Sequence, residues 1–202
     1  MTAEDADAFR RCIEAGGVAV FPADTVYGLA CDPESEAAVS RLYELKGRPA
    51  ERPAAVMFPA LDAALTAIPT APRTGAALRA NLPGPVTVLL PNPRRRFPLA
   101  CVRDPETIGV RVPDLPLLAQ LDRPLLQSSA NLSGRSDPRR LSDVPEAIRH
   151  GADLSLDGGE LPGTPSTVVD LRRYEADGTW EVVREGAVAR GPLDRTLSSV
   201  AG

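Results

Sequence analysis

Short apolar runs alternate with amphipathic segments along this chain, without an internal repeat. A short apolar run bounded by glycine or proline is typical of a buried strand, whereas apolar residues at helical spacing are typical of a helix with one buried face. Strands that alternate with helices build an α/β domain, because each helix covers the sheet that its neighbouring strands form. The pattern therefore predicts the α/β class.

The expected elements follow from this reading. Helices are predicted at residues 3–15, 34–45, 61–68, 73–80, 115–121 and 143–150. Strands are predicted at residues 18–21, 54–58, 86–90, 108–112, 125–126, 154–157, 166–171 and 180–184. Polar loops are expected directly after two strands, at 23–25 and 127–134, and a glycine- and proline-rich loop at 157–165. We expect one domain at 1–190 and a loose tail at 191–202.

Composition narrows the class of protein. A net charge of −4 and a pI near 5.1 argue against coating nucleic acid through bulk electrostatics. Three widely spaced cysteines, Cys12, Cys31 and Cys101, indicate neither a disulfide framework nor a zinc motif. The N-terminal residues lack a secretion signal, and no apolar run is long enough to span a membrane. These features predict a soluble cytoplasmic protein.

A single lysine, Lys46, stands among 22 arginines. Lysine is a compact ammonium on a flexible stem, whereas arginine presents a planar fork, so the two differ where a point charge must reach an anion. Lys46 is therefore a candidate site residue, at the end of a predicted helix and followed by Arg48. Arginine-biased coding that left one lysine by chance explains the count equally well, and cations are favoured at that helix end anyway.

The familiar nucleotide and hydrolase motifs are missing from the sequence. There is neither a GxxxxGK[ST] loop nor a GxGxxG turn after a strand. His150 is the only histidine and lies at a predicted helix end, where a surface cation is the plainer interpretation than a catalytic base.

Strand-terminal loops carry small hydroxyls, amides and arginines instead. Such groups suit ligation chemistry on a nucleotide, which needs positioning and charge neutralisation more than a protein nucleophile. For any single serine or threonine, a local cap or turn is the simpler interpretation. The candidates are Thr25, Lys46, Arg48, Thr107, Arg111, Ser129, Asn131, Ser133, Ser166 and Arg184.

Five ordered blocks carry a family resemblance. They are Ala23–Leu29 (ADTVYGL), Lys46–Pro49 (KGRP), Leu82–Thr87 (LPGPVT), Ser129–Gly134 (SANLSG) and Ser166–Asp170 (STVVD). In order and spacing, from about Gly17 to Gly186, the chain resembles the YrdC-type threonylcarbamoyl-AMP synthase family. The resemblance implies a single twisted mixed sheet flanked by helices, with a large concave, locally basic pocket.

The resemblance also implies a reaction and its participants. ATP, bicarbonate and L-threonine would combine into threonylcarbamoyl-AMP and pyrophosphate, with magnesium on the phosphates. Partner proteins would then use the product to modify the adenosine beside the tRNA anticodon. By motif, Thr25, Arg111, Ser129 and Ser166 would surround threonine. Lys46, Arg48, Arg52, Thr107, Asn131 and Arg184 would serve ATP, and no residue is assigned as catalytic or as a protein ligand to a metal.

Two positions depart from the family pattern. Met57 stands where some members carry a histidine near the threonine, and Arg139 stands where a small hydroxyl is usual. They leave open a paralogue that acts on another carbamoyl acceptor. A non-catalytic RNA-binding module of the same fold is a further alternative, with weak RNA binding by a locally basic surface, although the acidic pI counts against it.

Overall fold

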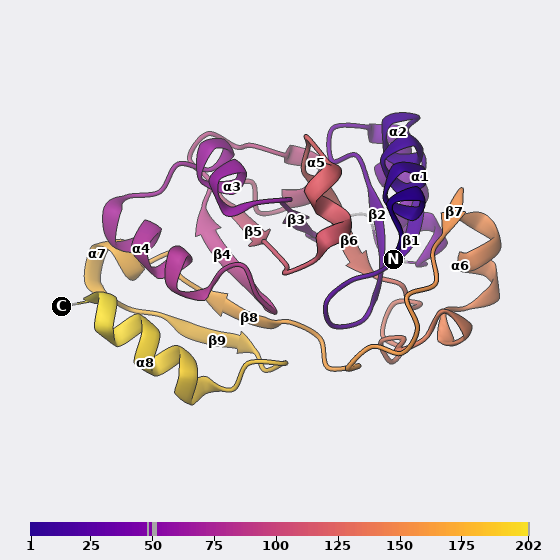
Figure 1. Cartoon of the computed structure of the whole chain (residues 1–202). Coiled ribbons are helices and arrows are strands. Elements are labelled where there is room, and N and C mark those ends of the chain that lie inside the picture. Colours follow the sequence, from indigo (N-terminus) through magenta and orange to yellow (C-terminus); the bar gives the residue numbers. More distant parts are fainter. Residues whose placement is uncertain (48, 50–51, 202) are drawn as a thin grey trace.

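One mixed β-sheet organises the molecule (Figure 1). The computed structural model describes residues 1–47, 49 and 52–201. Within these residues the sheet has nine strands, in the order β7-β1-β2-β6-β3-β5-β4-β8-β9. The strands are β1 (Ala19–Pro22), β2 (Tyr27–Cys31), β3 (Ala55–Met57), β4 (Val86–Pro91), β5 (Thr107–Arg111), β6 (Leu125–Ser129), β7 (Leu154–Ser155), β8 (Thr167–Asp170) and β9 (Glu181–Arg184).

Helices lie against both faces of this sheet. They are α1 (Ala3–Glu14), α2 (Glu36–Leu45), α3 (Leu61–Ala67), α4 (Pro72–Asn81), α5 (Pro98–Cys101), α6 (Glu146–Gly151), α7 (Tyr174–Asp177), α8 (Arg190–Ala201), and the 3-10 turns η1 (Pro116–Gln120) and η2 (Leu141–Asp143). The predicted α/β class with one mixed sheet flanked by helices is confirmed.

Successive strand residues face two different apolar clusters. In β3, Val56 packs into the larger cluster, to which α2, α3, α4, α6 and α8 contribute, whereas Met57 packs into the smaller one with α1 and η1. Leu126 and Leu125 of β6 divide in the same way. Side chains alternate across a strand, so the two clusters mark the two faces of the sheet. We call the face covered by α1 and η1 the α1 face.

Strand β6 connects parts of the chain that are distant in sequence. It pairs antiparallel with β2 on one side, where Gly28 lies opposite Ser129, and antiparallel with β3 on the other, where Ala55 lies opposite Gln127. Gly28 permits this arrangement because a Cβ there would lie 2.9 Å from Nε2 of Gln127. The end of β6 is thereby held between the loop that precedes β2 and the start of β3.

The structure corrects several predicted boundaries. Residues 27–31, which follow the loop expected at 23–25, form strand β2, and its five residues are all buried, so no alternation signals it. Strand β6 continues to Ser129, which puts the first residues of the expected polar loop inside the sheet. The short helices α5 and α7 had no periodicity to predict them, since each has only four residues.

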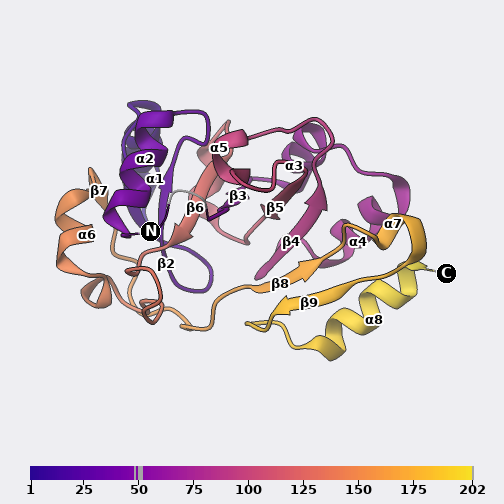
Figure 2. The same ribbon diagram turned by 180° about the vertical axis from the view of Figure 1, so that it is seen from behind.

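The C-terminal segment is helical. Residues 190–201 form α8, and its Leu193 and Leu197 are each 1% exposed in the larger apolar cluster. The hydroxyl of Tyr174 donates a hydrogen bond to the carbonyl of Leu197. The expected loose tail is therefore wrong, because burial of these leucines offsets the cost of ordering the segment. The domain boundary at residue 190 stays a prediction. In Figures 1 and 2, α8 runs beside β9 at the end of the sheet remote from α1.

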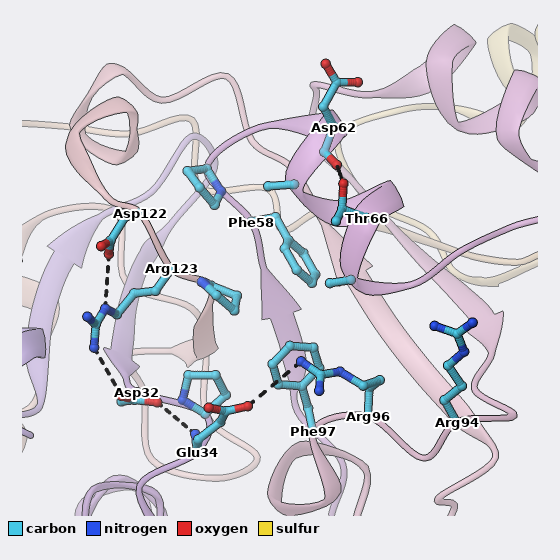
Figure 3. Close-up of a pocket in the computed structure, with 15 residues that line it drawn as sticks. Asp32, Glu34, Phe58, Asp62, Thr66, Arg94, Arg96, Phe97, Asp122 and Arg123 are labelled. Carbon is cyan, nitrogen blue, oxygen red and sulfur yellow. Dashed lines mark hydrogen bonds and ion pairs between the residues drawn. The ribbon is translucent and has the colours of Figure 1, made fainter.

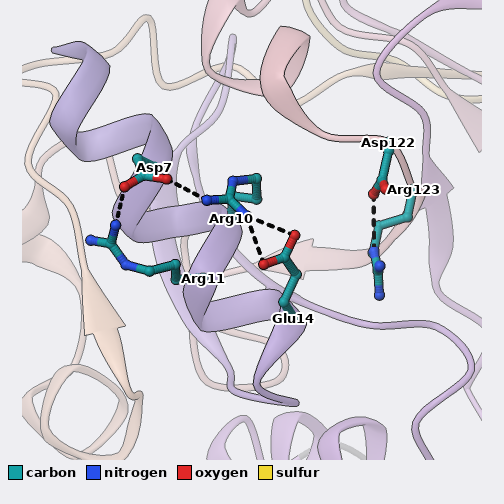
Figure 4. A network of polar contacts seen from close by, with 6 residues as sticks. All are labelled: Asp7, Arg10, Arg11, Glu14, Asp122 and Arg123. Atoms are coloured by element: carbon teal, nitrogen blue, oxygen red, sulfur yellow. Dashed lines mark hydrogen bonds and ion pairs between the residues drawn. The ribbon is translucent and has the colours of Figure 1, made fainter.

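The exposed side of α1 carries charges spaced one helical turn apart (Figure 4). Asp7 pairs with both Arg10 and Arg11, and Arg10 also contacts Glu14 at 2.7 Å. Such exposed i,i+3 and i,i+4 pairs stabilise a helix by only about 0.3–0.5 kcal/mol each. The apolar side of α1, with Phe9 at 0% exposure, is therefore what attaches it to the sheet.

Leu197→Ala tests the packing of α8. We expect it to lower the free energy of unfolding by about 2–4 kcal/mol, since it removes a fully buried side chain. Leu132→Ala is the matched control, because Leu132 is 40% exposed; it should change stability by less than about 0.5 kcal/mol. Urea denaturation followed by circular dichroism measures both. Equal, small effects of the two substitutions would mean that α8 does not pack on the sheet.

Candidate functional site

A cavity of about 420 Å³ lies over the middle of the sheet. Its floor is formed by side chains of β3, β5, β4, β8 and β6, and its rim by the loops before β2 and β8. The volume falls within the range of about 300–1,000 Å³ that is usual for small-molecule sites. The polar side chains that line it are Thr25, Thr87, Asp104, Thr107, Arg111, Gln127, Ser128, Ser129, Asp137, Ser166, Arg172 and Arg184.

The register of the strands explains why the sheet has room for a cavity at this place. Ala55, Gly109 and Leu89 lie side by side on adjacent strands and all line the cavity. Ala55 has the same side-chain direction as Met57, two residues along β3, so this floor belongs to the α1 face. Met57, however, is fully buried with Leu117 and Leu125. The cavity therefore occupies the part of the α1 face that η1 leaves uncovered, and it is deeper because Ala55 has a small side chain and Gly109 has none.

Arg111 is the most buried cation of the cavity wall. Its side chain is 3% exposed, forms an ion pair with Asp24, and donates hydrogen bonds to Oγ1 of Thr25 at 2.9 Å and to Oε1 of Gln127 at 3.4 Å. Asp24 was not among the residues that sequence predicted, although it adjoins Thr25. The ion pair fixes the guanidinium at the end of β5, above the floor of the cavity.

Burial perturbs both partners of this pair. Loss of solvent raises the pKa of Asp24, an effect that the positive charge of Arg111 partly opposes. Loss of solvent likewise lowers the pKa of Arg111, and the negative charge of Asp24 partly opposes this shift. Arginine stays protonated in proteins even so. The wall of the cavity thus holds a fixed positive charge whose counter-ion is a single carboxylate.

Hydroxyl groups of β4 and of the loop before β8 form a second polar group. The hydroxyls of Thr87 and Ser166 lie 2.8 Å apart. Arg184 of β9 donates to the carbonyl of Ser166 at 2.7 Å and to its hydroxyl at 3.3 Å. The structure therefore brings the predicted Ser166 and Arg184 together, and adds Thr87, which the sequence analysis placed in a strand and in the third family block but did not name as a site residue.

Lys46 lies behind the cavity rather than among its lining residues. It is 2% exposed, and Nζ donates to the carbonyls of Ser129 and Asn131, the latter at 2.9 Å, and to Oδ1 of Asn131 at 3.0 Å. Ser129 Oγ also donates to that Oδ1, at 2.6 Å. Lys46 thus connects the end of α2 to the segment after β6 through three hydrogen bonds to described residues.

Arg172 is a cavity residue that sequence analysis missed. It forms an ion pair with Asp170 at 2.5 Å, lies 3.7 Å from Asp104, and donates to Oγ1 of the predicted Thr107 at 3.2 Å. No motif marks Arg172, which follows the fifth block and is one of many arginines. The charged lining residues are Arg111, Arg172, Arg184, Asp104 and Asp137.

The remaining predicted residues lie apart from the cavity or outside the described chain. Arg52 is exposed and is not a lining residue, although its carbonyl accepts a hydrogen bond of 2.8 Å from Tyr43. Arg48 lies outside the described residues. Ser133 is exposed, and its N–H donates to the carbonyl of Lys46 at 3.0 Å. Arg139 is exposed and pairs with Glu160 at 2.9 Å.

A larger cavity of about 910 Å³ opens beyond α5, between α3 and the loop before β6 (Figure 3). Phe58 and Phe97 form its base. Along one side, Arg123 lies 3.7 Å from Asp32, and Arg96 lies 3.9 Å from Glu34. No described residue of the predicted site lines this cavity. Arg123 and Arg96 are thus paired with carboxylates of the same wall. Because the predicted site residues line the smaller cavity instead, the smaller cavity is the better candidate site.

A comparison with known proteins identifies the relationship. A family model for Sua5, YciO and YrdC proteins, described as telomere recombination, matches residues 11–186. The chain belongs to the Sua5/YciO/YrdC family. Among curated family members, the threonylcarbamoyl-AMP synthase of Pseudomonas aeruginosa is 37% identical over 169 residues, which cover 80% of this chain and 89% of the relative.

Longer family members match over part of their length. The threonylcarbamoyl-AMP synthase of Pyrococcus abyssi is 33% identical over 194 residues, 93% of this chain and 56% of the relative. This chain thus spans about half the length of that protein. A Pyrococcus abyssi Sua5 structure complexed with L-threonine has a TM-score of 0.83 at 27% identity, covering 95% of this chain and 56% of that one.

A shorter family member is similar over its whole length. The crystal structure of Escherichia coli YciO has a TM-score of 0.79 at 28% identity, covering 93% of this chain and 92% of YciO. The predicted family is confirmed by these matches. Within the described part of the chain, no helix has the length and apolar character needed to cross a membrane.

Lys46→Ala tests how the single lysine is used. We expect a loss of about 2–4 kcal/mol in the free energy of unfolding, because the substitution removes buried, charge-assisted hydrogen bonds to the segment after β6. Arg41→Ala on the same helix is the control, because Arg41 pairs with Asp153 at an exposed site; its effect should stay below about 1 kcal/mol. Urea denaturation measures both. A Lys46→Ala variant as stable as the control would show that these contacts contribute nothing to the fold.

The thiols provide a second test. Burial raises the pKa of Cys31 to about 12 and that of Cys12 to about 11, and it also raises the pKa of Cys101, which lines the cavity. A thiol below its pKa is protonated and a poor nucleophile. At pH 8 the folded protein should therefore react slowly with iodoacetamide, and faster as pH rises, whereas the unfolded protein should label fully. Mass spectrometry counts the labels, and rapid labelling of Cys101 would reveal a thiolate in the cavity.

Proposed function

We propose that this protein is a threonylcarbamoyl-AMP synthase, which forms threonylcarbamoyl-AMP and pyrophosphate from ATP, bicarbonate and L-threonine. The observation that carries the proposal is the 37% identity to the Pseudomonas aeruginosa synthase over nearly the whole of that relative. The arrangement of the cavity supports it, because arginines, hydroxyls and the amide of Gln127 converge there, and no histidine is among the described lining residues. Nucleotidyl transfer needs mainly positioning and charge neutralisation.

We propose that one part of the cavity holds the amino acid. Thr25, Arg111, Ser129 and Ser166 all line the cavity and come from four separate segments of the chain. A guanidinium can bind a carboxylate through two parallel hydrogen bonds, which fixes its orientation as well as its position. Hydroxyl groups around it can both donate and accept, as the hydroxyl of threonine does.

We propose that the ATP phosphates lie toward Thr107 and Arg184, which also line the cavity. Lys46 and Asn131 would act from behind the rim, where Lys46 holds the segment after β6 and adds a positive charge close to it. Arg52 and Arg48 would reach the nucleotide from the segment that follows α2. Arg172 joins this set as a further cation of the lining. A locally basic site results if these arginines turn toward the nucleotide.

Magnesium enters the proposal with the nucleotide. The described residues contain no group of three or more histidine, cysteine or acidic side chains placed to hold a metal ion. Hard oxygen ligands suit Mg²⁺, and in nucleotide enzymes substrate phosphates often provide most of them. We therefore propose that magnesium is bound chiefly by ATP and water. It would neutralise phosphate charge beside Arg184 and Thr107.

The biological setting belongs to the same proposal. The product would pass to partner proteins that modify the adenosine beside the tRNA anticodon, and the protein would act in the cytoplasm. Direct contact with RNA would be weak, because the net charge of the chain is −4.

A second candidate is a paralogue with the same cavity and another carbamoyl acceptor. The match to 92% of YciO supports keeping it, since that family member is not named for the synthase reaction. Met57, which prompted this alternative, is fully buried under η1 rather than in the cavity lining. The substitution at this position therefore does not by itself argue against threonine.

The deciding experiment is an assay with ATP, magnesium, bicarbonate and L-threonine, with mass detection of threonylcarbamoyl-AMP and a parallel measurement of pyrophosphate. We expect threonine-dependent product with matching pyrophosphate. Gln127→Ala is an informative variant, because the amide accepts a hydrogen bond from Arg111; it should lower kcat/KM for threonine by about five- to tenfold.

Other outcomes separate the alternatives. Pyrophosphate and AMP released without threonine would favour the paralogue with another acceptor. Absence of turnover, together with RNA affinity that falls steeply with salt, would favour the non-catalytic RNA-binding module.

A further inference from the structure

The ion pair between Asp24 and Arg111 is incompletely satisfied. Among the described residues, Oδ2 of Asp24 and Nε of Arg111 are the buried side-chain polar atoms that have no hydrogen-bond partner. The two side chains are 11% and 3% exposed. Buried polar atoms are rarely left without partners, so two of them in one ion pair require an explanation. One is an acceptor and the other is a donor.

Their location connects them with the cavity. Arg111 lines the cavity, as does Thr25, which follows Asp24 and accepts a hydrogen bond from Arg111 at 2.9 Å. The proposed amino-acid substrate would place its carboxylate on Arg111. That carboxylate would compete with Asp24 for the same guanidinium, because both are anions.

The competition has an electrostatic consequence. If a simple carboxylate took the guanidinium, Asp24 would be left as a buried charge without a counter-ion, which is costly. An α-amino acid avoids this cost because its ammonium lies next to its carboxylate. The ammonium supplies a donor and a positive charge for Asp24, while the carboxylate supplies an acceptor and a negative charge for Arg111.

We propose that Asp24 is the receptor for the α-ammonium of the substrate, so that Asp24 and Arg111 together recognise a zwitterionic amino acid and discriminate against carboxylates that lack the amine. This inference rests on the proposed function and deepens it. In the structure the two charges are paired with each other, and the ammonium and carboxylate of the substrate would bind between them, each to the group of opposite charge. The site discriminates against a ligand without the amine because such a ligand would leave the buried carboxylate of Asp24 without a counter-ion.

The test compares two ligands on three forms of the full chain by isothermal titration calorimetry. The ligands are L-threonine and (R)-3-hydroxybutanoate, which has the same carbon skeleton without the α-amino group. The forms are the wild type, Asp24→Asn, and Asp137→Asn as a matched control. Asp137 is a carboxylate of the cavity lining that takes no part in the ion pair, so Asp137→Asn makes the same charge change as Asp24→Asn and leaves the ion pair intact.

We expect the wild type to prefer threonine by at least about tenfold, since truncating one partner of a buried charge pair has effects of this size or larger. Asp24→Asn should lower affinity for threonine but preserve or improve affinity for 3-hydroxybutanoate, so the preference collapses. Asp137→Asn should retain the wild-type preference for threonine over 3-hydroxybutanoate. If Asp24→Asn lowered the affinity for both ligands by the same factor, the inference would be overturned, because Asp24 would then merely position Arg111.

Two further results separate this inference from the proposed function. Equal affinity of the wild type for both ligands would overturn the ammonium receptor and leave the synthase proposal intact, and this comparison does not depend on any variant folding. If the wild type binds no threonine, the proposed function fails. In that case, the affinities for glycine and acetate are compared by NMR titration, because these ligands differ in the amine and lack the threonine side chain. Equal affinity for the two would overturn the ammonium receptor.

Discussion

The pairing of β6 with β2 on one side and β3 on the other is the constraint on which the site depends. This central strand carries Gln127 and Ser129, and its register places them beside the start of β3 and the beginning of β2. Arg111 enters from β5 through the parallel β3–β5 pair. Residues separated by about a hundred positions in sequence thereby form one cavity wall. The hydrogen-bond ladder, with side-chain direction fixed at every second residue, allows little freedom in where they lie.

The same ladder leaves part of the sheet uncovered. On the face opposite the site, the larger apolar cluster packs against helices along the sheet. On the α1 face, α1 and η1 cover only the portion that includes Met57 and Leu125. The uncovered portion is lined by small or polar residues such as Ala55, Gly109 and Thr87. The lining also includes Leu89 and Val168, so this open part of the face combines apolar and polar side chains, as is usual for small-molecule sites.

Charges within the site are restrained by neighbours rather than free in solvent. Lys46 is held by carbonyls of the segment after β6, Arg172 by Asp170, and Arg111 by Asp24. Such groups are oriented before a ligand arrives, which lowers the cost of ordering them on binding. The Asp24–Arg111 pair differs from the other two because two of its buried atoms have no hydrogen-bond partner among the described residues. A ligand with both charges completes it, and this links the packing of the wall to the chemistry of the proposed substrate.

Sequence alone determined the α/β class, the family and six of the polar residues that line the cavity. Thr25, Thr107, Arg111, Ser129, Ser166 and Arg184 could be named because each belongs to an ordered motif or lies in or beside a predicted strand. Sequence periodicity failed where local signals were absent: β2 is buried at all five positions, and α8 is stable only because two leucines pack on the rest of the fold. Only the tertiary structure could identify Asp24, Gln127 and Arg172 as partners, because hydrogen bonds and ion pairs depend on distances between segments that the sequence does not encode locally. For the same reason, only the tertiary structure distinguished the role of Lys46 from that of Arg111. Lys46 holds the segment after β6 through hydrogen bonds, whereas Arg111 lines the cavity.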